Sequence, residues 1–177
     1  EDRPDMPLLL FYLPEGVEVT AETASELSSA AAGDIFERAL AADRVRPRME
    51  EASINDAIRE LLRSHFDTDR KALARLTAVF TDIAQKQPIE LEPGVLLLHA
   101  HVDEAKEPLV FFGARQEGLR LLSLEVPARL VVLLCAPTSQ TPEDHLRILG
   151  EIARLLKEGR VAQRLGLADS GPEEGPP

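Results

Sequence analysis

The stretch 92–103, Glu-Pro-Gly-Val-Leu-Leu-Leu-His-Ala-His-Val-Asp, constrains the fold of this chain more than any other. Its Pro-Gly pair marks a turn, and the four apolar residues that follow are typical of a strand covered on both faces. Because side chains alternate along a strand, His99, His101 and Asp103 would project from one face. The stretch therefore predicts a buried strand with polar groups at its far end. A phosphate acceptor, a metal site and an ordinary strand end all remain open at this point.

The charge and composition of the chain exclude several classes of protein. With 177 residues, 44% of them apolar, it can bury one substantial core. Its net charge of −11 argues against nucleic-acid binding and gives no attraction to anionic lipid. The single cysteine, Cys135, lies in an apolar run, which indicates a core position and a reducing compartment. No apolar run approaches the roughly 18 residues that span a bilayer, so a soluble chain is predicted.

Three amphipathic helices are predicted from capping residues and from apolar residues at helical spacing. The first begins after Ser53, the second runs over residues 69–86 and ends before Pro88, and the third begins at Thr141-Pro142 and ends at Gly159. A short helical turn is expected over residues 161–167. These helices imply apolar stripes that must pack against a common core.

Four strand-like runs lie between the second and third helices, at residues 94–100, 108–114, 119–126 and 129–136. The first and the last are continuously apolar in their centres, as expected for strands covered on both faces. The sequence therefore predicts an α/β fold in which α-helices sandwich a mixed β-sheet.

We expect three regions along the chain. Residues 1–47 form an extra N-terminal segment with short strands and a helix, which ends in a polar junction at 43–48. Residues 48–167 form the α/β domain, and residues 168–177 form a tail with nothing to bury. Because the chain begins with Glu1 rather than Met, we expect a fragment of a longer protein or a processed product.

Histidines are the residues best suited to carry chemistry in this chain. His99 closes the apolar strand, and His145 lies in the first turn of the third helix, where free N–H groups and the helix dipole attract a phosphoryl group. Spacing alone leaves open whether the two meet. His65 has no acidic or histidine neighbour at metal-ligand spacing and is expected at the surface.

Two short motifs resemble a known family. Residues 94–101, Gly-Val-Leu-Leu-Leu-His-Ala-His, are similar to the phosphohistidine strand of mannitol/fructose-type enzyme IIA domains of the bacterial phosphotransferase system, Gly-Ile-Ala-hydrophobic-Pro-His-Ala-Arg. Residues 144–149 are similar to the helix start of that family, His-Leu-x-x-Leu. The resemblance covers roughly residues 52–167. It implies the enzyme IIA fold, His99 as phosphoryl acceptor, His145 as its orienting and stabilising neighbour, a phosphohistidine carrier protein as partner, and no cofactor.

The chain departs from the family pattern at three places. Leu98 stands where the family has proline, and His101 stands where it has a basic residue. The stretch 83–87, Ile-Ala-Gln-Lys-Gln, replaces an Arg-Glu pair whose arginine helps to bind the phosphoryl group. A site with less positive charge should hold a phosphoryl group less well.

The function expected first is therefore an enzyme IIA-like regulatory or sensing domain on the cytoplasmic side of a membrane transporter, such as an ion/proton antiporter or an anion or amino-acid transporter. Its partner would be the transmembrane part of the same polypeptide or complex. The apolar run 8–13 is expected to pair either within the chain or with a second copy, which would form a homodimer. The alternatives are an active phosphocarrier that uses His99, and a metal-binding, hydrolase-like site at His99, His101 and Asp103. In the simplest alternative, His99 is a hydrogen-bonded strand-end residue and His145 a surface residue.

Overall fold

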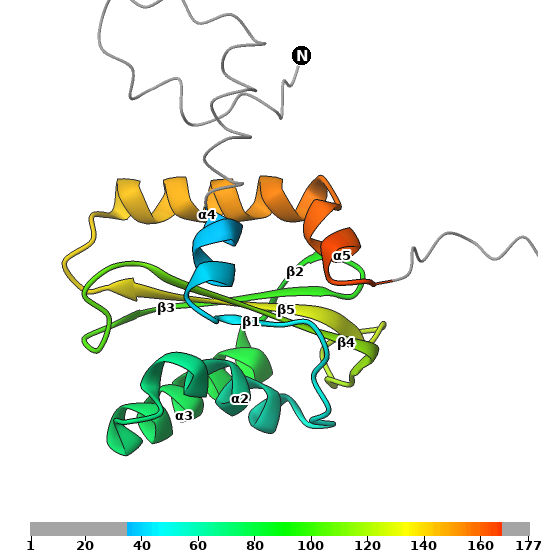
Figure 1. The fold of residues 1–177 in the computed structure, drawn as a ribbon, viewed down its shortest axis with the longest axis horizontal. Helices are drawn as coiled ribbons and strands as arrows, with labels where there is room; N and C mark the ends of the chain where they lie inside the picture. Colours follow the sequence, from blue (N-terminus) through cyan, green and yellow to red (C-terminus); the bar gives the residue numbers. More distant parts are fainter. Residues whose placement is uncertain (1–34, 168–177) are drawn as a thin grey trace, which may run out of the picture.

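The computed structural model describes residues 35–167 of the chain. Within this range the chain forms a five-stranded mixed sheet with helices on both faces, in the strand order β1-β4-β5-β3-β2 (Figure 1). The strands are β1 (Val45–Arg46), β2 (Ile89–Glu92), β3 (Val95–Val102), β4 (Leu109–Leu119) and β5 (Ala128–Pro137). The predicted α/β sandwich with a mixed sheet is confirmed.

Strand β5 lies at the centre of the sheet because its side chains are apolar on both faces. Every residue of β5 except Arg129 is buried. On one side β5 pairs with β3 in parallel, which places His99 beside Leu134, and on the other side it pairs with β4 in antiparallel. The histidines of β3 therefore lie at the end of the sheet where β3 and β5 both terminate.

Two helical layers enclose the sheet (Figure 1). Helices α2 (Ile54–Phe66) and α3 (Arg70–Lys86) cover one face, while α4 (Pro142–Lys157), α5 (Arg160–Arg164) and a helical turn at residues 35–41 cover the other. The core on the α2–α3 face includes Leu61, Leu76, Phe80, Leu98, Phe111 and Leu133. The core on the α4 face includes Phe36, Leu97, Phe112, Leu130, Ile152 and Leu155. Cys135 is buried in the first of these cores, as predicted.

The predicted helix starts are confirmed by their caps. The Ser53 hydroxyl accepts a hydrogen bond from the Asp56 N–H, and the Thr141 hydroxyl accepts one from the Asp144 N–H. Each capping hydroxyl therefore gives a hydrogen-bond partner to one of the N–H groups that a helix N-terminus leaves unpaired. Gly159, with a φ of 71°, follows the end of α4 in the left-handed conformation that glycine adopts readily.

The prediction of a strand over residues 119–126 is wrong. Strand β4 continues to Leu119, and residues 120–127 form the connection to β5, in which the Leu122 side chain is fully exposed. The chain turns at Gly118, whose φ of 75° is readily adopted by glycine. A side chain does not fit there either, because a Cβ at this position would lie 2.5 Å from the Pro127 Cβ. The alternating apolar residues of this stretch are typical of a strand. However, Gly118 and Pro127 lie at its two ends, and the stretch between them is a hairpin loop.

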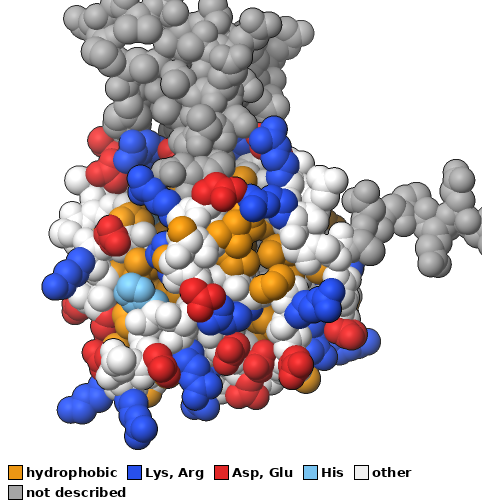
Figure 2. All heavy atoms as spheres, in the orientation of Figure 1, with side chains coloured by type: hydrophobic (Ala, Val, Ile, Leu, Met, Phe, Trp, Pro, Cys, Tyr) orange, Lys and Arg blue, Asp and Glu red, His pale blue; other side chains and the backbone are white. Residues whose placement is uncertain are grey.

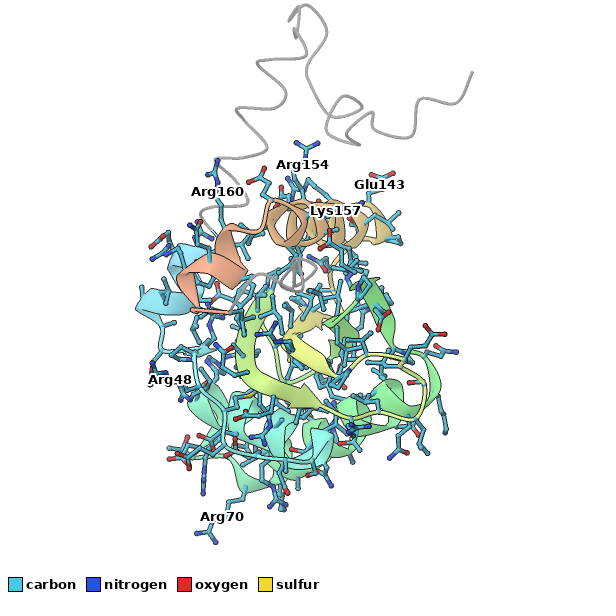
Figure 3. All side chains as sticks on the ribbon, turned by 90° about the vertical axis from the view of Figure 1, so that its right-hand side faces the viewer. Arg48, Arg70, Glu143, Arg154, Lys157 and Arg160 are labelled. Carbon is cyan, nitrogen blue, oxygen red and sulfur yellow. The ribbon has the colours of Figure 1, made fainter. Side chains whose placement is uncertain are left out.

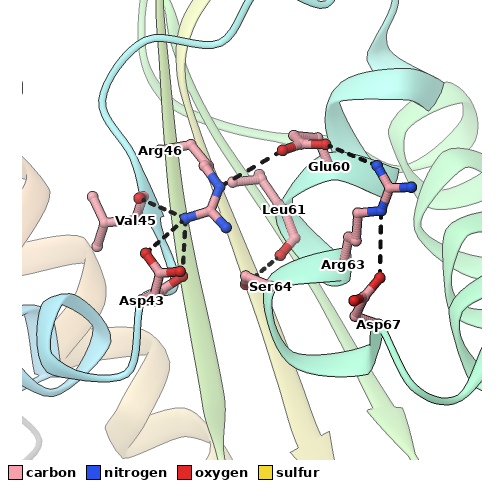
Figure 4. Close-up of polar contacts among 8 residues, drawn as sticks. All are labelled: Asp43, Val45, Arg46, Glu60, Leu61, Arg63, Ser64 and Asp67. Atoms are coloured by element: carbon pink, nitrogen blue, oxygen red, sulfur yellow. Dashed lines mark hydrogen bonds and ion pairs between the residues drawn. The ribbon is translucent and has the colours of Figure 1, made fainter.

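The predicted junction at residues 43–48 contributes a strand to the sheet. Val45 and Arg46 pair in parallel with Phe112 and Gly113 of β4. Arg46 bonds to Asp43 on one side and pairs with Glu60 of α2 on the other, at 3.8 Å (Figure 4). The predicted boundary after residue 47 therefore lies inside a packed unit, because Phe36, Ala39 and Val45 belong to the core on the α4 face. The predicted elements before residue 35 and the predicted tail lie outside the described residues.

The surface carries both signs of charge. The view in Figure 2 shows lysine and arginine interspersed with aspartate and glutamate. Glu143 and Arg154 of α4 point away from the sheet (Figure 3), while Ile152 and Leu155 of the same helix are buried. In residues 35–167, no helix combines the length and the apolar character needed to cross a membrane.

Candidate functional site

Strand β3 changes from apolar to polar along one face. Leu96 and Leu98 belong to the core on the α2–α3 face, whereas Leu97 belongs to the core on the α4 face. Because the side chains alternate, His99 and His101 continue the face on which Val95 and Leu97 lie. The strand therefore presents both histidines toward the layer that contains α4.

Helix α4 places a third histidine above these two. Strand β5 ends at Pro137, and the loop that follows leads to Thr141, the N-cap of α4. Since β5 runs parallel to β3 and beside it, this loop brings the start of α4 over the end of β3. His145, the fourth residue of the helix, is 7% exposed, so the simplest alternative, in which it is a surface residue, is wrong.

The three imidazoles form a compact cluster, which we call the histidine cluster: His99, His101 and His145. His145 Nε2 lies 3.0 Å from His99 Nδ1, although 46 residues separate the two in the sequence. The His145 ring also lies against the His101 ring, with 4.2 Å between the ring centroids and 38° between the planes. The fold therefore answers the question that spacing left open, because His99 and His145 meet.

Gln140 lies beside the outer nitrogen of His145. Its Oε1 is 3.2 Å from His145 Nδ1, and this contact is a hydrogen bond in the tautomer of His145 that has its proton on Nδ1. In that neutral tautomer Nε2 of His145 is an acceptor, and Nδ1 of His99, 3.0 Å away, donates to it. Nε2 of His99 is left with its lone pair free, as a nucleophile requires.

Burial keeps the two bonded histidines neutral. The pKa of His99 is lowered mainly by burial and further by the charge of His101. The pKa of His145 is lowered by burial first and then by His101 and His99. Because both shifts disfavour the imidazolium form, they favour a neutral His99 ring, with one protonated nitrogen, at neutral pH.

Positive side chains are missing from the contacts of this cluster. Among residues 35–167, no hydrogen bond or ion pair joins a lysine or arginine to His99, His101 or His145. The stretch 83–87, where the resemblance implies an arginine, lies at the end of α3 in the opposite helical layer, and its Lys86 pairs with Asp82 at 2.8 Å.

The remaining sequence candidates lie apart from the cluster. Strand β3 ends at Val102, so Asp103 is an exposed turn residue rather than a third member of the strand face. No three His, Cys, Asp or Glu side chains in the described part of the chain are arranged to hold a metal ion. His65 is exposed near the end of α2, as predicted. Gln140 was not predicted, because a lone glutamine before a helix cap carries no sequence signal.

Comparisons with known proteins agree with this fold. The family model described as "Phosphoenolpyruvate-dependent sugar phosphotransferase system, EIIA 2" matches residues 39–171. No curated protein sequence matches the chain. The crystal structure of the nitrogen regulatory protein IIA-Ntr from Neisseria meningitidis is similar, with a TM-score of 0.58 and 17% identity, over 74% of this chain and 93% of that one.

A second solved structure is the mannitol-specific cryptic phosphotransferase enzyme IIA CmtB from Escherichia coli, with a TM-score of 0.49 and 19% identity, over 71% of this chain and 83% of that one. At these identities the likeness to solved structures concerns the fold. The family model, in contrast, matches most of the sequence itself, and residues 94–101 and 144–149 lie within the matched range. The chain therefore belongs to the EIIA 2 family of the phosphoenolpyruvate-dependent sugar phosphotransferase system.

Proposed function

We propose that this domain accepts a phosphoryl group on Nε2 of His99 from a phosphohistidine carrier protein. The observation that carries this proposal is the hydrogen-bonded chain from Gln140 through His145 to His99, which leaves Nε2 of His99 unprotonated. A half-buried, neutral imidazole with one oriented nitrogen is a suitable acceptor for phosphoryl transfer.

Phosphoryl transfer to His99 exchanges one N–P bond for another. The Nε2 lone pair of His99 forms the new N–P bond, while the N–P bond of the donor phosphohistidine breaks and its electron pair returns to the donor nitrogen. Positive charge develops on the His99 ring as the bond forms. His145 Nε2, 3.0 Å from Nδ1 of His99, can take up that charge by accepting the Nδ1 proton. His145 therefore stabilises the phosphorylated ring, and Gln140 orients His145.

A second candidate function is a regulatory or sensing domain that acts on a membrane transporter in the same polypeptide or complex. The observation that favours it is the missing cation contact at the histidine cluster within residues 35–167. Without such a cation, the domain holds a phosphoryl group less firmly. The phosphorylation of His99 would then report on the phosphorylation state of the donor rather than drive transport. In this case phosphorylation would change the contact between the domain and its partner.

Phosphoryl transfer from the carrier protein tests the first proposal. Incubation with the phosphohistidine carrier protein and its upstream donor should add one acid-labile phosphate per chain. His99→Ala should abolish the label, whereas His65→Ala, which removes an exposed histidine outside the cluster, should keep it. Absence of label, under conditions that label another EIIA 2 domain, would contradict the proposal.

The regulatory proposal predicts a different measurement. A transporter segment that the domain controls should bind it with a different affinity when His99 is phosphorylated. The comparison can be made between the native domain, labelled and unlabelled, and His99→Ala as the form that stays unlabelled. Equal affinity in the two states would exclude regulation by phosphorylation.

A further inference from the structure

We propose that His101, when protonated, binds the phosphoryl group on His99 and makes the retention of that group depend on pH. This inference rests on the proposed phosphorylation of His99. It concerns a residue near the end of β3, in a cluster to which no lysine or arginine of residues 35–167 is hydrogen-bonded.

The position of His101 gives it access to the group on His99. The two side chains leave the same face of β3 two residues apart, and side chains on one face of a strand are spaced about 7 Å apart along it. A phosphoryl group on one ring can bridge such a distance to a donor on the other. The two rings also share a neighbour, since His145 lies against both, with centroid distances of 5.0 Å to His99 and 4.2 Å to His101.

The hydrogen bonds of the cluster leave His101 as its available donor. Both nitrogens of His145 are engaged, one with Gln140 and one with His99. In the described part of the chain His101 has no hydrogen bond and no ion pair, and its side chain is exposed. A protonated imidazole donates from both nitrogens, so His101 can offer N–H groups and a positive charge to phosphoryl oxygens.

The titratable groups around His101 come from β3 and α4. On β3 the neighbour is His99, and on α4 it is His145, with Glu143 and Asp144 in the same helical turn. Asp103, in the turn after β3, interacts electrostatically with Arg75 of α3. Glu143 points away from the sheet (Figure 3), and Asp144 accepts from Thr141 and pairs with Arg147. From β5 the neighbour of His101 is Ala136, which carries no charge, and β2 pairs only with residues 95–97 of β3.

This arrangement makes the proton on His101 sensitive to phosphorylation. The charge of His101 contributes to the lowered pKa values of His99 and His145, so the three rings are electrostatically coupled. A phosphoryl group adds about two negative charges at pH 7, and these charges favour a proton on His101. Phosphorylation should therefore be linked to proton uptake, and a proton on His101 should in turn retain the phosphoryl group.

The test compares the native domain with His101→Gln and His101→Arg. Each is labelled, and the half-life of the label is measured from pH 6 to pH 8, with the unfolded labelled chain as the reference for the intrinsic acid lability of phosphohistidine. A charge-assisted hydrogen bond predicts that the native domain keeps the label about tenfold longer than His101→Gln at pH 6. The two should converge at pH 8, and His101→Arg should keep the label at both pH values.

Two outcomes overturn the inference without touching the proposed function. The first is a native domain and a His101→Gln variant whose half-lives depend on pH in the same way. The second is an NMR titration of the His101 ring that is unchanged by phosphorylation of His99. A native domain that takes no label at all would instead overturn the proposed function, and this inference with it.

Discussion

The two faces of the central sheet differ in the side chains that strand β3 contributes to them. On the face covered by α2 and α3, β3 contributes Leu96, Leu98 and Val102, all of them buried in one apolar core. On the face covered by α4, the same strand begins with Val95 and Leu97 and continues with His99 and His101. A strand that separates the two faces residue by residue can hold an apolar core and a polar site within eight residues. The comparison suggests that stability and chemistry can be changed independently.

The largest expected effect is on the face without the site. Phe80 of α3 is fully buried, so Phe80→Ala should lower the free energy of unfolding by about 3–5 kcal/mol through lost burial and a cavity. Urea unfolding measures the change, and Leu122→Ala, at a fully exposed position, is the control, with a change within about 0.5 kcal/mol. If the faces are independent, folded Phe80→Ala should still accept phosphate at the native rate. A slower rate of phosphoryl transfer would show that the two faces are not independent.

The second prediction concerns the face with the site. His145→Ala removes the acceptor for the His99 Nδ1 proton, so the rate of phosphoryl transfer to His99 should fall by about 100-fold. Stopped transfer reactions with the phosphorylated carrier protein measure this rate. Gln140→Ala should have a smaller effect in the same direction, because it frees His145 to adopt the other tautomer. A His145→Ala variant with the native rate would exclude the proposed role of this residue.

The elements of the fold also differ in whether the sequence could predict them. The buried strands and the three long helices were predictable because caps at Ser53 and Thr141 and apolar runs mark them locally. The strands β1 and β2 were not predicted, since one has two residues and the other, Ile89–Glu92, alternates with exposed acidic residues. Such short edge strands are recruited by the sheet they join rather than by their own composition.

The site was predictable only in part, for a related reason. The strand motif pointed to His99 and the helix start to His145, but the hydrogen bond between them depends on the parallel pairing of β3 with β5. The contact of His101 with His145 and the bond from Gln140 depend on the same placement of α4. Local sequence patterns carry no information about such contacts, because they arise between elements far apart in the chain.

A third prediction uses the pH dependence of stability. The pKa values of His99 and His145 are lowered in the folded domain, mainly by burial, so the unfolded chain binds more protons near and below the ordinary histidine pKa of about 6.5. The stability due to these neutral rings is complete above that pH and is lost as pH falls toward the lowered values. Urea unfolding from pH 8 to pH 5 should show this loss.

The matched variant for that measurement is the double substitution His99→Gln with His145→Gln. It should lose less stability than the native domain between pH 7 and pH 5. The remaining slope should include His65, whose side chain is exposed overall but whose pKa is lowered by partial desolvation of the ring and then by Arg44, and His65→Gln should reduce the slope further. An unchanged slope in the double variant would show that the cluster histidines do not titrate differently in the folded and unfolded states.

The smallest effect gives the sharpest contrast between the faces, because the chain contains two caps of the same geometry. Ser53 caps α2 and Thr141 caps α4; each hydroxyl accepts from an N–H three residues on at 3.2 Å and donates to the carboxylate of that residue. Ser53→Ala and Thr141→Ala should therefore each lower the free energy of unfolding by about 1 kcal/mol. Only Thr141→Ala loosens the turn that carries His145, so it alone should slow phosphoryl transfer to His99, by a factor of a few. If both variants slowed transfer equally, the site would depend on the stability of the whole domain, and the two faces of the sheet would not be separate in function.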